Sequence, residues 1–462
     1  MTGATVSIHG MWSTRLAFIL AAAGSAVGLG NIWRFPYMAG EYGGAAFVLL
    51  YLLCVAALGI PIMMAEILLG RRGRQSPINT MRTLAKREGK TPAWSLLGWM
   101  GIVSGFLILS FYSVIAGWTL AYMVRAAGGA FSGIDAAGSA ALFGGLTGDG
   151  ERLLAWHTIF MVLTILVVAR GVASGLEQAV KWMMPALFIL LLVMVGYAAQ
   201  TGDLGAAARY LFAPDFGKLG DHAGEAILSA MGQAFFSLSL GMGAIMIYGS
   251  YLKSDASIMQ NTVIIALLDT SVSLLAGLAI FPMVFSHGLE PGSGPGLIFV
   301  TLPIAFGEMP GGAFFGALFF LLLVFAAWTS AISLLEPVVA WLVENRGFSR
   351  VRASVLAGSA VWLLGIACLL SLNHWSGYTL FGKGVLDLFD YLTANILLPL
   401  GGILIAIFAG WVLPRRATLD ELGMDDGLGY RLWRFLVRYV SPLAVALVLL
   451  NALGLLRALG LT

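Results

Sequence analysis

The chain has 462 residues, of which 59% are apolar and only 11% are charged, and its formal net charge at pH 7 is +3. Soluble domains usually carry about 25% charged residues, so this composition excludes a water-soluble globular protein of this size. The small net charge gives no reason to expect a nucleic-acid partner. Two cysteines, Cys54 and Cys368, lie inside apolar runs without metal or redox spacing. The sequence therefore predicts an all-α membrane protein whose surroundings are a lipid bilayer.

Apolar runs of about 20 residues recur along the chain, and each predicts a membrane span. We expect eleven spans, at about 14–38, 44–70, 93–126, 153–170, 176–199, 223–251, 258–286, 312–343, 351–370, 384–413 and 432–459. The intervening segments 128–152, 200–222 and 287–311 are Gly/Pro-rich and are predicted to fold over the outer face. Since none of these loops is long enough for a second domain, residues 1–462 are expected to form one domain.

The basic residues gather in loops that share one side of the membrane when the spans alternate. They are Arg71, Arg72, Arg74, Arg82, Lys86, Arg87, Lys90, Arg346, Arg350, Arg352, Arg415, Arg416 and Arg431. The opposite loops hold mainly acids, namely Asp135, Asp149, Glu151, Asp203, Asp215, Asp221, Glu290 and Glu308. Because cytoplasmic loops carry the excess of Lys and Arg, we expect the N-terminus inside and, after eleven spans, the C-terminus outside.

The first predicted span carries glycines and an asparagine at mid-membrane depth, in residues 24–31 (GSAVGLGN). Small residues four apart also favour tight helix packing, and this segment alone fits that reading equally well. The sixth span repeats the pattern in residues 236–243 (FSLSLGMG). Two interrupted helices at corresponding positions of two halves indicate a transporter site. Unwound backbone there can offer carbonyls to a cation and N–H groups to a carboxylate.

The segment from Trp12 to Tyr37 (WSTRLAFILAAAGSAVGLGNIWRFPY) resembles the first helix of the neurotransmitter:sodium symporter family. Further motifs of that family follow along nearly the whole chain: Gly59, Ile60 and Pro61 with Glu66, Tyr112 with Trp118, Gln233 to Gly243, Ala326 to Ser330, and Asp390. The resemblance is to the bacterial amino-acid transporter branch. It implies an inverted repeat of five plus five helices with helices 1 and 6 broken, at about 12–199 and 223–413, and an extra span at about 432–459.

The resemblance also implies a function. The chain would be a sodium-coupled symporter of neutral, hydrophobic (aliphatic and aromatic) L-amino acids in the cell membrane, working by alternating access, and not an enzyme. It would use Na⁺ at two sites, without chloride, an organic cofactor or an obligate protein partner. A small neutral substrate such as glycine, or a channel or receptor on the same fold, are the alternatives. The sequence has no ATP-binding loop, so an ion gradient is the simpler energy source.

Two cation sites follow from the resemblance. The first would use the Ala26 carbonyl with Asn31, Ser237 and Asp269, and the second the carbonyls of Gly24, Val27 and Ala326 with the hydroxyls of Thr329 and Ser330. Many relatives have asparagine at the position of Asp269, and chloride-dependent relatives bind an anion close by, where Tyr51, Gln233, Ser237 and Ser273 match. A fixed negative charge on Asp269 would replace that anion, which predicts chloride independence. The alternative is that Asp269 lies near the cytoplasmic end of its helix and is simply solvated.

The remaining site residues also follow from the resemblance. The substrate pocket would be formed by Ser25, Ala26, Leu29, Gly30, Ile108, Tyr112, Phe236, Ser237, Ser239, Met242, Ser330 and Leu334. Arg34 and Asp390 would close the outer path as an ion pair, above Tyr112 and Phe236. The inner gate would use Trp12, Tyr251 and Glu344. Relatives pair this acid with an N-terminal arginine, where the present chain has His9.

Overall fold

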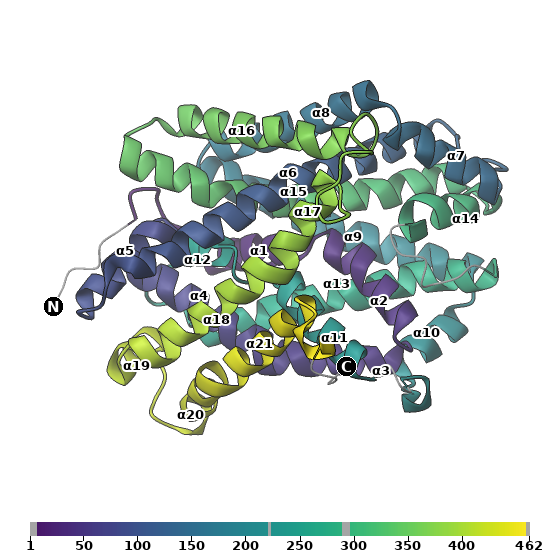
Figure 1. The fold of residues 1–462 in the computed structure, drawn as a ribbon. Helices are drawn as coiled ribbons and strands as arrows, with labels where there is room; N and C mark the ends of the chain where they lie inside the picture. Colours follow the sequence, from purple (N-terminus) through teal and green to yellow (C-terminus); the bar gives the residue numbers. More distant parts are fainter. Residues whose placement is uncertain (1–6, 220–222, 289–295, 459–462) are drawn as a thin grey trace.

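In the computed structural model, the described residues 7–219, 223–288 and 296–458 are almost entirely helical (Figure 1). The only extended pairing within these ranges is an isolated bridge between Leu380 and Lys383. Nine helices in the described part are long and apolar enough to cross a membrane: Ala45–Gly73, Pro92–Ala127, Gly150–Ala169, Val172–Thr201, Ile258–Ser286, Gly312–Arg346, Arg350–Leu370, Val385–Val412 and Leu428–Ala452. The prediction of an all-α, multi-pass membrane protein is therefore confirmed.

The two spans predicted to be interrupted are the two that are broken. α1 (Arg15–Ala26) is followed by η1 (Gly30–Arg34) and α2 (Phe35–Glu41), and the two halves are bent by 54°. The predicted span 223–251 consists of α11 (Ala223–Ser237) and α12 (Ala244–Ser250), with non-helical residues 238–243 between them. Each half of the second pair is too short to cross a membrane alone. Ten spans are thus evident by length when the first pair is counted as one. The remaining predicted span, 223–251, corresponds to this second broken pair.

The three segments that we predicted to fold over the outer face contain short helices, which the sequence analysis did not identify. They are α7 (Ala136–Thr147), α10 (Leu204–Phe212) and α14 (Leu302–Glu308). Asp135 and Asp203 cap the first two, accepting the N–H groups of Gly138 at 2.7 Å and Ala206 at 2.8 Å. A side-chain oxygen at the N-cap satisfies a backbone donor that a helix cannot satisfy itself. Two predicted loop acids, Asp221 and Glu290, lie outside the described residues.

The broken helices occupy the interior of the bundle (Figure 1). α1 packs against α9 (Glu177–Thr201), α13 (Ile258–Ser286) and α15 (Gly312–Arg346), and α12 packs against α4 (Ile60–Gly73) and α15. The longest helices, α15 and α6 (Ser95–Ala127), pack extensively against each other. The other helices are α3 (Ala45–Cys54), α5 (Pro77–Arg87), α8 (Gly150–Ala169), α16 (Arg350–Leu370), α17 (Val385–Leu392), α18 (Leu398–Ile407), α19 (Arg415–Leu422), α20 (Leu428–Phe435), α21 (Ser441–Ala452) and α22 (Leu455–Ala458). Irregular backbone is thereby kept away from lipid, as a membrane requires.

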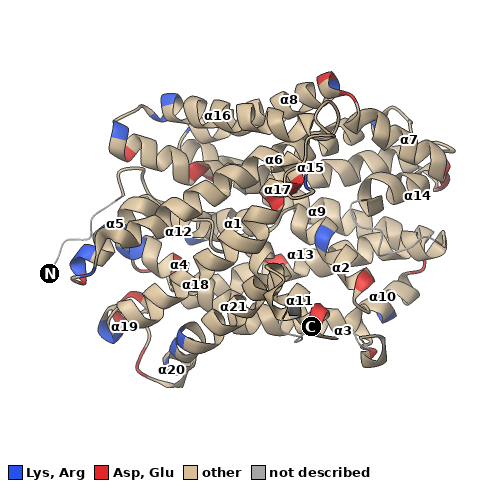
Figure 2. Cartoon of the chain, in the orientation of Figure 1, with Lys and Arg blue, Asp and Glu red and all other residues tan. Residues whose placement is uncertain are grey.

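Charged residues gather at the two ends of the bundle (Figure 2). Basic residues cluster at the end where α5, α19 and α20 lie, and acidic residues predominate at the opposite end around α7 and α10. The band between the ends is mostly uncharged. This distribution places basic and acidic loops on opposite sides, as the sequence predicts. The division of the chain into two repeats stays a prediction.

Candidate functional site

The break in the first helix exposes backbone groups at the centre of the bundle. Val27 leaves the helical conformation with a ψ of 109°, and its own N–H still closes the helix on the Ala23 carbonyl. The Gly28 N–H donates to Oδ1 of Asn31 at 3.0 Å, and the Leu29 N–H donates to the Tyr112 hydroxyl at 3.3 Å. The carbonyls that precede the break have no following helical turn, so they are available to other donors or to a cation.

The break between α11 and α12 is fixed by hydrogen bonds to α1 and α4. Ser239 has a φ of 53°, which is unusual for a residue with a Cβ and is a form of strain that is often found at functional sites. Its hydroxyl donates to the Ser25 carbonyl at 2.7 Å, which joins the two broken helices. The Gly241 N–H donates to the buried carboxylate of Glu66 at 2.6 Å. Glu66 was noted in the sequence only as a motif residue, and its contact with the opposite break could not be seen there.

All twelve predicted substrate-pocket residues line one small cavity of about 30 Å³ between the broken helices. Gly28 and Ser333 complete its lining. The Ser25 hydroxyl donates to the Ser333 hydroxyl at 2.8 Å, and the latter donates to the Ser330 carbonyl at 2.7 Å. The sequence analysis did not assign Ser333 to the pocket. It could have done so, because Ser333 lies three residues after Ser330 and therefore on the same face of the helix. Tyr112, Ser237, Ser239 and Ser330 add further hydroxyl groups to the lining, and none of the described lining residues is charged.

Two glycines at the break in the first helix let its backbone lie close to the opposite wall of the cavity. A Cβ at Gly28 would lie 2.8 Å from the Ser330 hydroxyl and 3.1 Å from the Tyr112 hydroxyl. A Cβ at Gly30 would lie 3.0 Å from the Phe236 ring. Glycine is therefore needed here because of close approach to the opposite wall.

Asp269 lies at the centre of a buried polar cluster beside the cavity. The Asn31 amide contacts its carboxylate at 2.7 Å and the hydroxyls of Ser237 and Ser273 at 3.0 and 2.9 Å. The Ser237 hydroxyl also donates to the Asp269 carboxylate, and the Tyr51 hydroxyl does so at 3.3 Å. Asp269 is therefore enclosed by protein, which excludes the alternative of a solvated helix end. Gln233 does not touch the carboxylate; its amide donates to the Gly30 carbonyl at 3.0 Å.

A second group of oxygens surrounds the Ser330 hydroxyl. The carbonyls of Gly24, Val27 and Ala326 lie 3.5, 3.2 and 3.2 Å from it. The Thr329 hydroxyl instead contacts the Phe325 and Ala326 carbonyls of its own helix, both at 3.1 Å. The five predicted members are thus neighbours, with Thr329 bonded back to its helix as an isolated threonine often is.

The outer gate residues lie on a cavity of about 350 Å³ above the substrate pocket. Arg34 and Asp390 both line it, but no ion pair between them lies within 4.0 Å in the described residues, so the predicted direct pair is absent. The Arg34 guanidinium instead lies over the Phe236 ring, 5.0 Å from its centroid. Attraction to the ring face competes with pairing, because aromatic faces carry negative potential.

The end of the bundle that holds the predicted inner-gate residues is closed by a dense set of contacts. The Trp12 indole donates to the Tyr248 carbonyl at 3.0 Å, and its backbone N–H donates to the Tyr251 carbonyl at 3.1 Å. The Tyr251 hydroxyl donates to Glu336 at 2.7 Å, and Glu336 also pairs with Arg350. The sequence analysis gave neither Glu336 nor Arg350 a role in this closure.

His9 takes part in this closure despite the departure from the family pattern. Its Nε2 lies 3.0 Å from Oε1 of Glu344, and both side chains are almost fully buried. Glu344 also accepts the Ser76 N–H at 2.7 Å and the Asn79 amide at 2.8 Å. The predicted inner gate residues therefore lie together, with a histidine as the partner of the acid.

The sequence matches the Sodium:neurotransmitter symporter family over residues 9–131 and 145–461. The chain belongs to this family.

Individual relatives agree with this family assignment. The uncharacterized sodium-dependent transporter YhdH of Bacillus subtilis is 40% identical over 448 residues, covering 96% of this chain and 98% of the relative. An uncharacterized sodium-dependent transporter of Haemophilus influenzae is 34% identical over 449 residues, with the same coverage. The crystal structure of MhsT in complex with L-phenylalanine superimposes with a TM-score of 0.87 at 42% identity, covering 96% of this chain and 99% of MhsT. The chain is thus a symporter of this fold rather than an enzyme.

Proposed function

We propose that this symporter couples sodium entry to the uptake of neutral, hydrophobic L-amino acids, without a requirement for chloride. The observation that carries this proposal is the pairing of an uncharged cavity between two broken helices with the enclosed Asp269 cluster at its side. The similarity to MhsT, which is solved with L-phenylalanine, supports the substrate class.

The Asp269 cluster suits a cation because it gathers several oxygen atoms around one buried carboxylate. The Asn31 amide contacts this carboxylate and the hydroxyl oxygens of Ser237 and Ser273. A hard monovalent cation prefers such oxygen ligands, and the carboxylate would offset the cost of placing its charge in the membrane. Rotation of the Asn31 amide would add a further oxygen. We assign the first sodium site to Asn31, Ser237, Asp269 and the Ala26 carbonyl.

The Ser330 cluster supports a second sodium site by the same reasoning. Its one hydroxyl hydrogen cannot satisfy the carbonyls of Gly24, Val27 and Ala326 at once. If the hydroxyl groups of Thr329 and Ser330 rotate, their oxygen atoms can face the cation. This site joins α1 to α15, so cation binding would hold these two helices together.

Chloride independence is assigned to the carboxylate of Asp269. Tyr51, Ser237 and Ser273, which match the anion-binding constellation, contact Asp269 or its partner Asn31. Their hydroxyls therefore already face a fixed negative charge. A chloride ion added beside it would be repelled.

The amino acid would bind between the two breaks. Its carboxylate would meet the Leu29 and Gly30 N–H groups and the Tyr112 hydroxyl, and its amine the carbonyls near Ala26 and Phe236. Ile108, Met242 and Leu334 provide apolar walls for the side chain. Met is unbranched and adapts to different shapes, so larger side chains could be accommodated than the closed cavity suggests. Its small volume of about 30 Å³ is the observation that favours the alternative of a small substrate such as glycine.

The closed inner contacts and the basic end of the bundle support an orientation. Glu344 accepts a hydrogen bond from Asn79 of α5 at 2.8 Å, and α5 lies at the end of the bundle that is rich in Lys and Arg (Figure 2). We assign this end to the cytoplasm because of its basic residues. The N-terminus would then lie inside, and α21 would carry the chain to the outside.

Uptake into proteoliposomes tests the proposal directly. Radiolabelled leucine, phenylalanine, tryptophan and glycine are offered with an inward sodium gradient, with potassium in place of sodium, and with gluconate in place of chloride. We expect concentrative uptake of the hydrophobic substrates that needs sodium and is unchanged in gluconate. Uptake that does not depend on sodium for any amino acid would overturn the coupling, and loss of uptake in gluconate would overturn the role of Asp269. Counter-flow of unlabelled substrate separates a carrier from a channel.

A further inference from the structure

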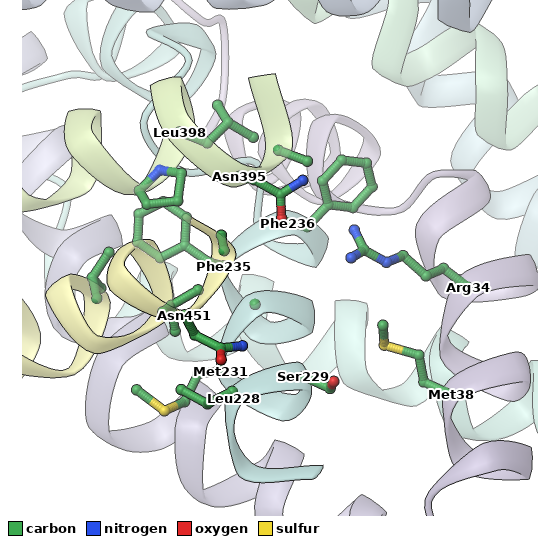
Figure 3. A pocket seen from close by; sticks show the side chains of 16 residues that line it. Arg34, Met38, Leu228, Ser229, Met231, Phe235, Phe236, Asn395, Leu398 and Asn451 are labelled. Atoms are coloured by element: carbon green, nitrogen blue, oxygen red, sulfur yellow. The ribbon is translucent and has the colours of Figure 1, made fainter. Parts of the chain in front are cut away.

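The last long span, Leu428–Ala452, is the least covered by protein of the nine long spans in the described residues. Only 17% of the residues in its apolar stretch are buried, against 39% or more in each of the other eight. Its second half still packs on protein, because Asn451 of α21 lines a cavity of about 140 Å³ with α11 and α18 (Figure 3). Its first half, α20 with η10 (Leu436–Val440), exposes large apolar side chains such as Leu432 and Phe435.

Three arginines occur in this first half at intervals that place them on one side of the helix. Arg431, Arg434 and Arg438 are spaced by three and four residues, and side chains so spaced are neighbours on a helix surface. Arg438 is the tenth residue after Leu428, about 15 Å along the helix axis. Charged side chains in a membrane span are costly and indicate a functional contact. Long basic side chains near a helix end can extend to the membrane surface, which here is the basic end of the bundle (Figure 2).

The Arg438 side chain is held by aromatic and apolar groups rather than by acids. Its stem lies against Gly410 of η9 (Phe408–Val412), where a Cβ would come within 2.7 Å of the Arg438 Cγ. Its guanidinium lies 4.0 Å from the centroid of the Trp411 ring, and the Trp411 indole donates to the Arg438 carbonyl at 3.0 Å. The buried Nε has no hydrogen-bond partner, and no carboxylate of the described residues lies within 4.0 Å of the guanidinium. A cation fixed in this way, yet without an acceptor, points to an acceptor from outside the chain.

The other two arginines extend the positive surface toward the end of the helix. Arg434 donates to the neutral hydroxyl of Tyr430 at 2.8 Å. Arg431 is exposed, and its Nε lies 3.6 Å from Asp426, which also pairs with Arg415. Among the described residues, the acid that contacts this surface is therefore already shared by two arginines. Positive charge exceeds negative charge here, which selects an anionic occupant.

Aromatic rings beside the arginines determine where the apolar part of the occupant lies. Trp411, Phe435 and Tyr439 are each about half exposed. The Tyr439 ring centroid lies 5.4 Å from that of Trp411 and 5.7 Å from that of Phe435. Trp and Tyr favour the headgroup level of a bilayer, and their exposed faces are covered there by hydrocarbon. An anion on the arginines with hydrocarbon along the rings is the arrangement of a phospholipid.

We propose that η9, α20 and η10 form a binding site for one anionic phospholipid of the leaflet at the basic end of the bundle. Its phosphate accepts hydrogen bonds from Arg438 and Arg431, and an acyl chain lies along Trp411 and Phe435. Headgroups without an ammonium group, such as phosphatidylglycerol, are preferred, because phosphatidylcholine places a cation beside the arginines. The bound lipid contacts both η9 and α20, so it stabilises their packing.

Native mass spectrometry of the purified full chain, with lipid added in detergent, counts bound lipids directly. Phosphatidylglycerol and phosphatidylcholine with identical acyl chains are added in separate experiments. We expect one phosphatidylglycerol to bind at least about fivefold more tightly than phosphatidylcholine, since each arginine near the membrane surface contributes about this factor for an anionic lipid. Arg438→Gln and Arg431→Gln should each lose about fivefold in affinity for phosphatidylglycerol. Arg152→Gln, the same change at an exposed position of α8, should bind as the unaltered chain does.

Thermal unfolding supplies a second readout. The unaltered chain and Arg152→Gln should unfold at a higher temperature with phosphatidylglycerol than with phosphatidylcholine, and the other two variants should show a smaller difference. Arg431 is exposed, so Arg431→Gln decides the question even where Arg438→Gln fails to fold. Equal affinity for the two lipids, or a full preference for phosphatidylglycerol in Arg431→Gln, would overturn the proposal. Displacement of the lipid by millimolar inorganic phosphate would show that the surface binds a free anion, and would overturn the assignment to a phospholipid.

Discussion

Asp269 is the single residue on which the ion requirements depend most. Its replacement by Asn keeps the shape of the side chain but removes a buried charge that contacts Asn31, Ser237 and Tyr51. We expect the sodium concentration for half-maximal uptake to rise about tenfold or more, equivalent to ~1.4 kcal/mol of binding free energy. Chloride should then partly restore uptake, because the polar groups lose their fixed anion.

The matched control is Asp426→Asn, at an exposed acid that pairs with Arg415 and lies far along the chain on the loop before α20. Exposed ion pairs contribute about 0–1 kcal/mol, so sodium affinity should stay unchanged there. An Asp269→Asn variant with the sodium affinity of the unaltered chain and no response to chloride would remove both roles assigned to Asp269.

Gly28 tests the close approach of the first break to the opposite wall. In Gly28→Ala, the added Cβ would lie 2.8 Å from the Ser330 hydroxyl and 3.1 Å from the Tyr112 hydroxyl, so Ser330 or the backbone must shift. A misplacement of about 1 Å in a site that depends on precise positioning can cost about 100-fold. We therefore expect substrate uptake to fall about 10- to 100-fold while the thermal stability changes little.

Gly144→Ala provides the comparison, because a Cβ at this position on α7 meets nothing within 4 Å. It should transport as the unaltered chain does. Normal uptake by Gly28→Ala would mean that this wall is flexible enough to absorb a methyl group, contrary to the geometry.

At the scale of elements, the N-terminal segment before α1 is fixed by the contacts of Trp12 with Tyr248 and Tyr251 and of His9 with Glu344. Replacing His9 by Ala removes the Nε2 contact with Glu344 at 3.0 Å, and a hydrogen bond to a charged group contributes about 1.5–3 kcal/mol. Amide hydrogen exchange of residues 7–14 should accelerate about tenfold or more, since local opening sets exchange rates. His9→Arg should keep slow exchange, because a guanidinium can donate to the same carboxylate.

The same segment allows a control that leaves Glu344 untouched. Ile8 is exposed next to His9, so Ile8→Ala should not change exchange. Unaltered exchange in His9→Ala would show that Trp12 and its contacts hold the inner side closed without the histidine.

The broken helices illustrate how far sequence reasoning reaches. Glycine and serine at mid-span predicted both breaks, because these residues weaken a helix locally and the pattern occurs in both halves. The capped outer helices were missed because Asp135 and Asp203 act through the N–H groups three residues later, which composition does not reveal. Contacts between distant segments, such as Glu66 with Gly241 and Tyr251 with Glu336, depend on packing and could not be predicted from spacing.

For the whole molecule, the two proposed sodium sites connect helices from both halves of the chain. The Asp269 cluster joins η1, α11 and α13, and the Ser330 cluster joins α1 and α15. A ligand that binds only the folded arrangement stabilises it, by about 2.7 kcal/mol at 100 times its dissociation constant. We therefore expect the thermal unfolding midpoint of the purified chain to be several degrees higher in sodium than in potassium at equal ionic strength.

The anion provides an internal control for this measurement. Sodium gluconate should stabilise as well as sodium chloride, and potassium chloride should not stabilise at all, because chloride is assigned no site. Asp269→Asn should lose part of the sodium effect and retain the part due to the Ser330 cluster, since the two clusters have no side chain in common. If Asp269→Asn retains the full stabilisation by sodium, the stabilising ion binds at the Ser330 cluster alone. If the unaltered chain has equal unfolding midpoints in sodium and in potassium, both site assignments are wrong.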